Sequence, residues 1–102
     1  MELDLDEIIK AIANPCRRQM LAWLKDPANN FDLSHPAHPE CEGVCVGKIV
    51  QKTGLSQSTV SAYMDVLQRA GLVKSERRGQ WTFYKRNEET IAAFLETIGA
   101  KL

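Results

Sequence analysis

The sequence predicts a small, mainly α-helical domain with one β-hairpin near its C-terminal end. Three observations support this prediction: apolar residues recur at helical spacing in several segments, glycines follow two of these segments, and two strand-forming runs flank a short turn. The chain has 102 residues, of which 44% are hydrophobic and 25% are charged, as is typical of one globular domain. We therefore expect a single domain over residues 1–102 with the element order α-α-α-α-β-β-α.

The N-terminal part predicts two helices followed by a long loop. The first helix has one apolar stripe, formed by Leu5, Ile8, Ile9 and Ile12. Asn14 followed by Pro15 is a helix-start signal, so a second helix is expected from about Pro15 to Lys25. Residues 26–43 contain three prolines and two histidines without apolar periodicity, which predicts a loop.

Two short helices joined by a tight turn are expected next. Residues 45–53 have helical apolar spacing, and Gly54 can supply the left-handed residue that ends this helix. Ser56 is a good N-cap for a second helix, which continues until Gly71. Because the second helix has a polar N-terminal end, this pair is typical of a helix-turn-helix.

A hairpin and a last helix complete the predicted domain. Strand-forming residues dominate 72–78 and 81–86, with Gly79 and Gln80 between them. Asn87 can cap the last helix, whose apolar stripe consists of Ile91, Phe94, Leu95 and Ile98. A hairpin that directly follows a helix-turn-helix predicts a winged helix-turn-helix.

Positive charge is concentrated in one segment, although the formal net charge is zero. Residues 1–55 carry 6 basic and 8 acidic side chains, residues 56–86 carry 6 and 2, and residues 87–102 carry 1 and 3. The net charges are therefore −2, +4 and −2. A contiguous basic segment can face DNA phosphates, while a basic surface without such a partner is the alternative.

Polar side chains open the second helix of the predicted helix-turn-helix. A helix enters the major groove with its N-terminal residues toward the bases, so these residues should be small or able to form hydrogen bonds. The candidate DNA contacts here are Ser56, Gln57, Ser58, Thr59 and Ser61. Helix capping alone accounts for Ser56, but five polar positions in six exceed what a cap requires.

The tip of the hairpin supplies further candidate contacts, namely Arg77, Arg78 and Gln80. A basic ribbon beside a recognition helix can follow phosphates or enter the minor groove. The alternative is a solvated strand edge whose charge prevents aggregation.

Several runs together resemble the ArsR/SmtB family of winged-helix repressors. They are ANPCRRQML at 13–21, CVGKI at 45–49, TGLSQSTVS at 53–61, LQRAGLV at 67–73 and RGQWTFY at 78–84. The resemblance implies a homodimer built from the first and last helices, DNA contacts at the residues named above, and release of DNA when an inducer binds. Where many members have His in the middle of the recognition helix, this chain has Ala62 and Tyr63, so Tyr63 becomes a candidate contact without a carried-over base preference.

The apolar stripes of the first and last helices are more than a small monomer easily buries. The candidate dimerisation residues are Leu5, Ile8, Ile9, Ile12, Ile91, Phe94, Leu95 and Ile98. Pairing these stripes across a two-fold axis would place two recognition helices about 34 Å apart, which predicts a palindromic operator in double-stranded DNA. Burial of both stripes inside one chain is the alternative.

Cysteine and histidine residues suggest a sensor. Cys41 and Cys45 are candidate ligands for a metal or metalloid inducer, with His35, His38 and Cys16 as further donors. Both metal sites usual in the family are incomplete, because Gly47 replaces one ligand and residues 91–102 contain no His or Asp. A disulfide between Cys41 and Cys45, or burial of the thiols as small apolar groups, are the alternatives.

Other function classes are disfavoured by the motifs. The sequence has no glycine-rich phosphate loop, nucleophile elbow or metalloprotease helix, and no motif demands a cofactor, so we do not expect an enzyme. The rival function is a winged-helix module that binds protein instead of DNA. The apolar runs of the chain are shorter than the roughly 20 residues of a membrane span, and no leader opens the chain. We therefore expect a soluble, cytoplasmic protein without a membrane partner.

Overall fold

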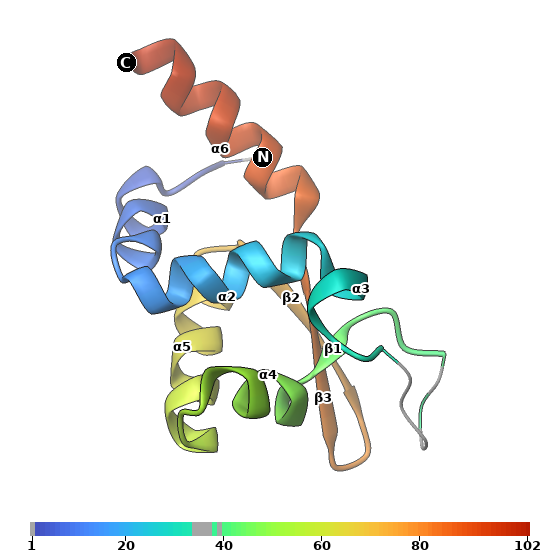
Figure 1. Ribbon diagram of the computed structural model, residues 1–102. Coiled ribbons are helices and arrows are strands. Elements are labelled where there is room, and N and C mark those ends of the chain that lie inside the picture. Colours follow the sequence, from blue (N-terminus) through green and yellow to red (C-terminus); the bar gives the residue numbers. More distant parts are fainter. Residues whose placement is uncertain (1, 34–37, 39) are drawn as a thin grey trace.

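The structure is a computed structural model that describes residues 2–33, 38 and 40–102 (Figure 1). Within these residues the elements are α1 (Leu5–Ile12), α2 (Pro15–Lys25), α3 (Pro27–Asn30), β1 (Val44–Cys45), α4 (Val46–Thr53), α5 (Gln57–Arg69), β2 (Val73–Arg78), β3 (Trp81–Arg86) and α6 (Glu88–Lys101). The predicted fold class, mainly α with a β-hairpin wing, is confirmed.

Two short elements differ from the predicted order. Helix α3 lies inside residues 26–43, which the sequence predicts as a loop, and it begins at a proline that suits the first helical position. Strand β1 takes Cys45, which the sequence assigns to the next helix, so α4 begins one residue later. Pairing with the distant β3 creates β1, and helical periodicity contains no signal for such a contact.

The three strands form an antiparallel sheet in the order β1-β3-β2. The β2–β3 register runs from Val73 opposite Arg86 to Arg78 opposite Trp81, and Gly79 turns the chain with a φ of 60°. On the other edge of β3, Val44 lies opposite Tyr84. The hairpin therefore projects as a wing beside α4 and α5 (Figure 1).

Side-chain caps fix the helix ends that the sequence predicts. The side chain of Asn14 accepts hydrogen bonds from the backbone N–H groups of Cys16 at 2.8 Å and Arg17 at 3.1 Å. From the start of α2, Arg17 also donates to the carbonyl of Ala11 at 2.7 Å, and Arg18 donates to that of Ile12 at 2.6 Å. These bonds satisfy carbonyls at the end of α1 and connect that end to the start of α2.

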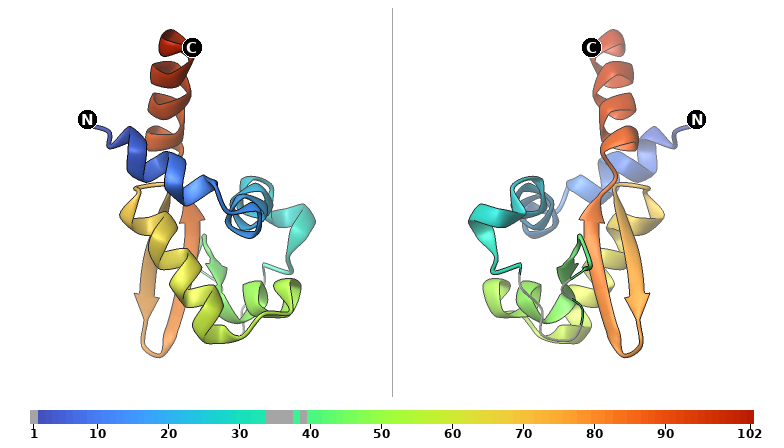
Figure 2. Two further views of the ribbon diagram at one scale, coloured as in Figure 1. Left: turned by 90° about the vertical axis from the view of Figure 1, so that its left-hand side faces the viewer. Right: turned by 90° about the vertical axis from the view of Figure 1, so that its right-hand side faces the viewer.

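The core lies between the helices and the inner side of the sheet. Its largest fully buried side chains come from α1, α2, β1, α4, α5 and the segment before β2, and they are Ile8, Met20, Ile49, Met64, Leu67, Leu72, Val44 and Val60. Phe94 attaches the first half of α6 to this core. The rest of α6 extends away from the body (Figure 2). None of the helices in the described ranges is long and apolar enough to cross a membrane.

We expect Gly43→Ala to destabilise the fold. A Cβ at this position would lie 2.9 Å from the carbonyl oxygen of Tyr84 and 3.1 Å from the Cβ of Phe83, so β1 and β3 would have to separate. The expected loss is about 1–3 kcal/mol of unfolding free energy, measured by thermal and urea denaturation. Gly47→Ala is the control, because its Cβ meets no atom within 4 Å and helix α4 gains a better helix former. Equal stability of the two variants would contradict the close packing of Gly43.

Candidate nucleic-acid interface

The N-terminal end of α5 presents the first predicted contacts. Ser56 is the N-cap, and its Oγ accepts from the backbone N–H of Thr59 at 3.2 Å, which confirms that it caps the helix. The same hydroxyl donates to Oγ1 of Thr59 at 2.9 Å and lies 3.2 Å from Oγ of Ser58. Gln57 and Ser58 are exposed at this end, so their side chains are accessible to another molecule.

The remaining predicted residues of α5 are less accessible. Thr59 and Ser61 are half-buried. Tyr63 is also half-buried and packs against the core, with the guanidinium carbon of Arg17 5.4 Å from the centre of its ring. Tyr63 thus lies toward α2, where it links the recognition helix to the rest of the domain.

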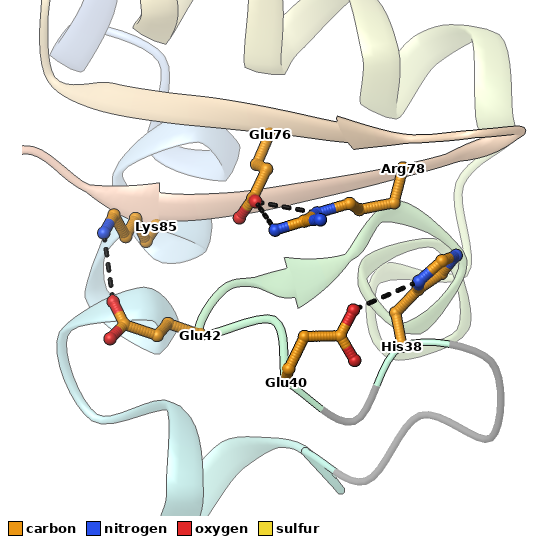
Figure 3. Close-up of polar contacts among 6 residues, drawn as sticks. All are labelled: His38, Glu40, Glu42, Glu76, Arg78 and Lys85. Carbon is orange, nitrogen blue, oxygen red and sulfur yellow. Dashed lines mark hydrogen bonds and ion pairs between the residues drawn. The ribbon is translucent and has the colours of Figure 1, made fainter.

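Carboxylates hold three of the five basic side chains of the hairpin. Arg78 pairs with Glu76 at 2.6 Å, Lys85 with Glu42 at 3.1 Å and Arg86 with Glu88 at 2.8 Å. Figure 3 shows the first two pairs. Lys74 and Arg77 form no ion pair with any residue that the structure describes. Two of these acidic partners, Glu42 and Glu88, lie outside the basic segment 56–86, so the net charge of that segment does not reveal them.

The exposed end of α5 and the tip of the wing lie at the same end of the molecule. In both Figure 1 and Figure 2, the N-terminal end of α5 lies near the level at which β2 and β3 turn, while α6 extends from the opposite end. Arg77, Arg78 and Gln80 are all exposed at this tip. The structure therefore brings the two predicted groups of DNA contacts onto one end.

The predicted metal ligands are spread over several elements. Cys45 is buried in β1 with 6% of its surface exposed, Cys16 packs half-buried on α2, and both are free thiols. Cys41 is half-buried, and its pKa is raised mainly by burial and also by Glu76, whereas Arg78 lowers it. Nδ1 of His38 lies 3.4 Å from Oε1 of Glu40, and His35 lies outside the described residues. Across the part of the chain that can be described, no three or more His, Cys, Asp or Glu side chains are grouped to hold a metal ion.

The predicted dimerisation residues divide into core and surface. Ile8 and Phe94 are buried, whereas Leu5, Ile12, Ile91 and Ile98 are half-buried. Ile9 and Leu95 are exposed, with 44% and 60% of their surfaces accessible. An apolar groove of about 280 Å³ runs between α1, α2 and α6 and includes Leu95.

A helix-turn-helix formed by α4 and α5, followed by a basic wing at the same end, defines a winged helix-turn-helix DNA-binding domain. Comparison with known proteins identifies the family. The sequence model described as "Bacterial regulatory protein, arsR family" matches residues 42–75. An uncharacterized HTH-type transcriptional regulator of Bacillus subtilis, YbzH, is 46% identical over 94 residues, which cover 89% of this chain and 94% of the relative. The chain belongs to the ArsR family of transcriptional regulators.

Two further relatives agree with this assignment. A candidate arsenical resistance operon repressor of Halobacterium salinarum, ArsR2, is 34% identical over 98 residues, covering 96% of this chain and 70% of the relative. The solution structure of the homodimeric winged helix-turn-helix DNA-binding domain Mb0332 from Mycobacterium bovis superposes with a TM-score of 0.66 at 26% identity, covering 94% of this chain and 77% of that chain. The family consists of regulators and not enzymes, in agreement with the sequence prediction.

We expect Ser56→Ala to lower the unfolding free energy by about 1 kcal/mol, because the N-terminal N–H groups of α5 lose their cap. Ser58→Ala removes a neighbouring hydroxyl that caps no backbone group, and its effect should stay within about 0.5 kcal/mol. Urea denaturation of both variants measures the difference. A Ser56→Ala variant as stable as Ser58→Ala would show that the cap contributes nothing.

Proposed function

We propose that this regulator binds double-stranded DNA as a homodimer and represses transcription from a palindromic operator. The observation that carries the proposal is the exposure of Gln57 and Ser58 at the start of α5, at the same end of the molecule as the wing. The dimensions of a helix suit the major groove, and a two-stranded ribbon beside it can reach the adjoining backbone.

Each part of this surface has a chemical role in DNA reading. The side-chain amide of Gln57 can both donate to and accept from one adenine in the major groove. The hydroxyls of Ser58, Thr59 and Ser61 suit base edges or phosphates at the same entry point. The wing adds positive charge through Arg77 and polar contacts through Gln80, and these would anchor the helix in the groove.

A second copy of the chain would cover the apolar surface at the other end. The exposed Leu95 and the groove between α1, α2 and α6 are suited to packing against the same helices of a partner. The Mb0332 domain, which shares this fold, is homodimeric. A two-fold axis through α1 and α6 would present two copies of α5 about 34 Å apart, on one face of the duplex.

We infer repression, and not activation, from occupancy of the operator. A dimer that covers a palindromic promoter site excludes the transcription machinery, and the relative ArsR2 carries the name of an operon repressor. We place this activity in the cytoplasm, where the DNA partner is found. An inducer that weakens the dimer or moves the wing would release the operator.

We expect Gln57→Ala to weaken binding to the operator while leaving binding to unrelated duplex DNA unchanged. Loss of a bidentate base contact corresponds to about 1–3 kcal/mol, or roughly five- to 150-fold in Kd. Fluorescence anisotropy measures both affinities, with a duplex from the region upstream of the gene that encodes this chain and with a scrambled duplex. Gln51→Ala, at an exposed position of α4, is the matched control.

Two results would contradict the proposal. Wild-type specificity in the Gln57→Ala variant would show that the start of α5 does not read bases. A wild-type protein that binds no duplex at any salt concentration would favour the rival function, a module that binds protein.

We expect Leu95→Glu to convert a dimer into monomers, because a charge on this exposed apolar position would be buried by the partner. Light scattering after size exclusion measures the mass, and thermal denaturation of the monomer checks that each chain stays folded. Gln51→Glu adds the same charge on α4 and should remain dimeric. Persistence of the dimer in the Leu95→Glu variant would exclude this face of α6 from the interface.

A further inference from the structure

The two sides of the hairpin differ chemically, and the two neighbouring arginines at its tip lie on different sides. Side chains alternate along a strand, and residues directly opposite each other in an antiparallel pair share a side. Arg78, Glu76 and the opposed pair Lys74 and Lys85 therefore lie on one side. Arg77 lies on the other side together with Tyr84.

The side that carries Arg78 faces the supporting segment, which we define as residues 40–45. Glu42 of this segment pairs with Lys85 at 3.1 Å and offsets the repulsion between Lys85 and Lys74, which lie directly opposite each other. Gly43 approaches the backbone of Tyr84 so closely that a side chain would not fit. The segment then pairs with β3 through β1.

Arg78 is committed to this side. Its guanidinium donates to Glu76 through Nε at 2.8 Å and lies 2.6 Å from the same carboxylate through a second nitrogen. Glu76 raises the pKa of Arg78, and the nearby Cys41 and Glu40 raise it further. Figure 3 shows Arg78 and Glu76 on the side of the hairpin where Glu40 and Glu42 lie. The charge of Arg78 is thus balanced by acidic neighbours.

Arg77 has different surroundings. Burial raises the pKa of Tyr84, Asp65 of α5 raises it further and Arg77 lowers it, so Arg77 and the recognition helix influence the same phenol. Among the residues that the structure describes, the side chain of Arg77 donates a hydrogen bond to the backbone carbonyl of Gly79 at 3.0 Å. Within residues 2–33, 38 and 40–102 no carboxylate forms an ion pair with it, so its charge is available to an external anion.

We propose that Arg77 is the arginine of the wing that contacts a DNA phosphate, while Arg78 is a positioning residue that holds the wing against the supporting segment. The DNA contact of Arg77 rests on the proposed function. The two arginines are neighbours in the sequence and look equivalent there, but this proposal gives them different roles. A single exposed ion pair contributes little to stability. Here the attraction of Arg78 to Glu40 of the supporting segment acts together with the pair of Lys85 with Glu42, the close approach of Gly43 and the β1–β3 pairing.

The salt dependence of DNA binding separates the two roles. Each phosphate contact contributes about 0.9 to the slope of log K against log salt concentration, so Arg77→Ala in both subunits should reduce the slope by about 1.8. Arg78→Ala should keep the wild-type slope and lose affinity only because the wing is less well held. Equal reductions of the slope in the two variants, or an unchanged slope in Arg77→Ala, would overturn the assignment.

Hydrogen exchange in the absence of DNA tests the positioning role separately. By mass spectrometry, Arg78→Ala and Lys85→Met should exchange faster than wild type over residues 40–45, whereas Arg77→Ala should not. Arg78→Lys, which keeps a cation beside Glu76, should restore slow exchange. Unchanged protection of the supporting segment in Arg78→Ala would overturn the positioning role. If the wild-type chain bound no duplex, the proposed function would fail, but the exchange measurements would still decide what Arg78 does.

Discussion

Burial of one face of α5 is the constraint on which the functional surface depends. Val60, Met64 and Leu67 are completely buried and recur at helical spacing, so they determine how the helix is rotated about its axis. Shortening a buried side chain of this size costs about 2–5 kcal/mol, and any large rotation of α5 would expose all three. The packing of this buried face therefore holds Gln57 and Ser58 toward solvent.

Burial also fixes the orientation of the strands in the wing. Tyr84 and Phe83 are buried on opposite sides of β3, one toward α5 and the other toward the side that also carries Arg78. A shift of the register by one residue would exchange the two sides of the partner strand and move Arg77 away from the recognition helix. Gly79 has a left-handed backbone conformation that fixes the turn and, with it, the register of the two strands. This glycine therefore determines which of the two arginines lies on the side of the hairpin that faces α5.

Local signals in the sequence were sufficient for the longer helices and the hairpin, but not for the short elements α3 and β1 or for contacts between distant segments. Asn14 with Pro15, Ser56 and Gly54 specify helix ends through bonds within a few residues, and these boundaries agree with the structure. Strand β1 and the pair of Glu42 with Lys85 depend on residues some forty positions apart, which periodicity cannot reveal. The position of Tyr63 could have been found, because it precedes the buried Met64 by one residue and follows Val60 by three, at the edge of the apolar face.

The separation between the two ends of the molecule has a consequence for how such a regulator is controlled. The start of α5 and the wing lie at one end, while the exposed half of α6 extends from the other, so in the proposed dimer DNA reading and dimerisation would use different residues. In that proposal one subunit would supply only a single short helix and one available wing arginine, and we expect such a small surface to bind DNA weakly by itself. Joining two subunits makes the second contact effectively intramolecular, which can raise the affinity by orders of magnitude without adding any contact. A small change in the distance between the two recognition helices would remove this gain, so control of the operator requires only that the dimer geometry or the support of the wing be altered.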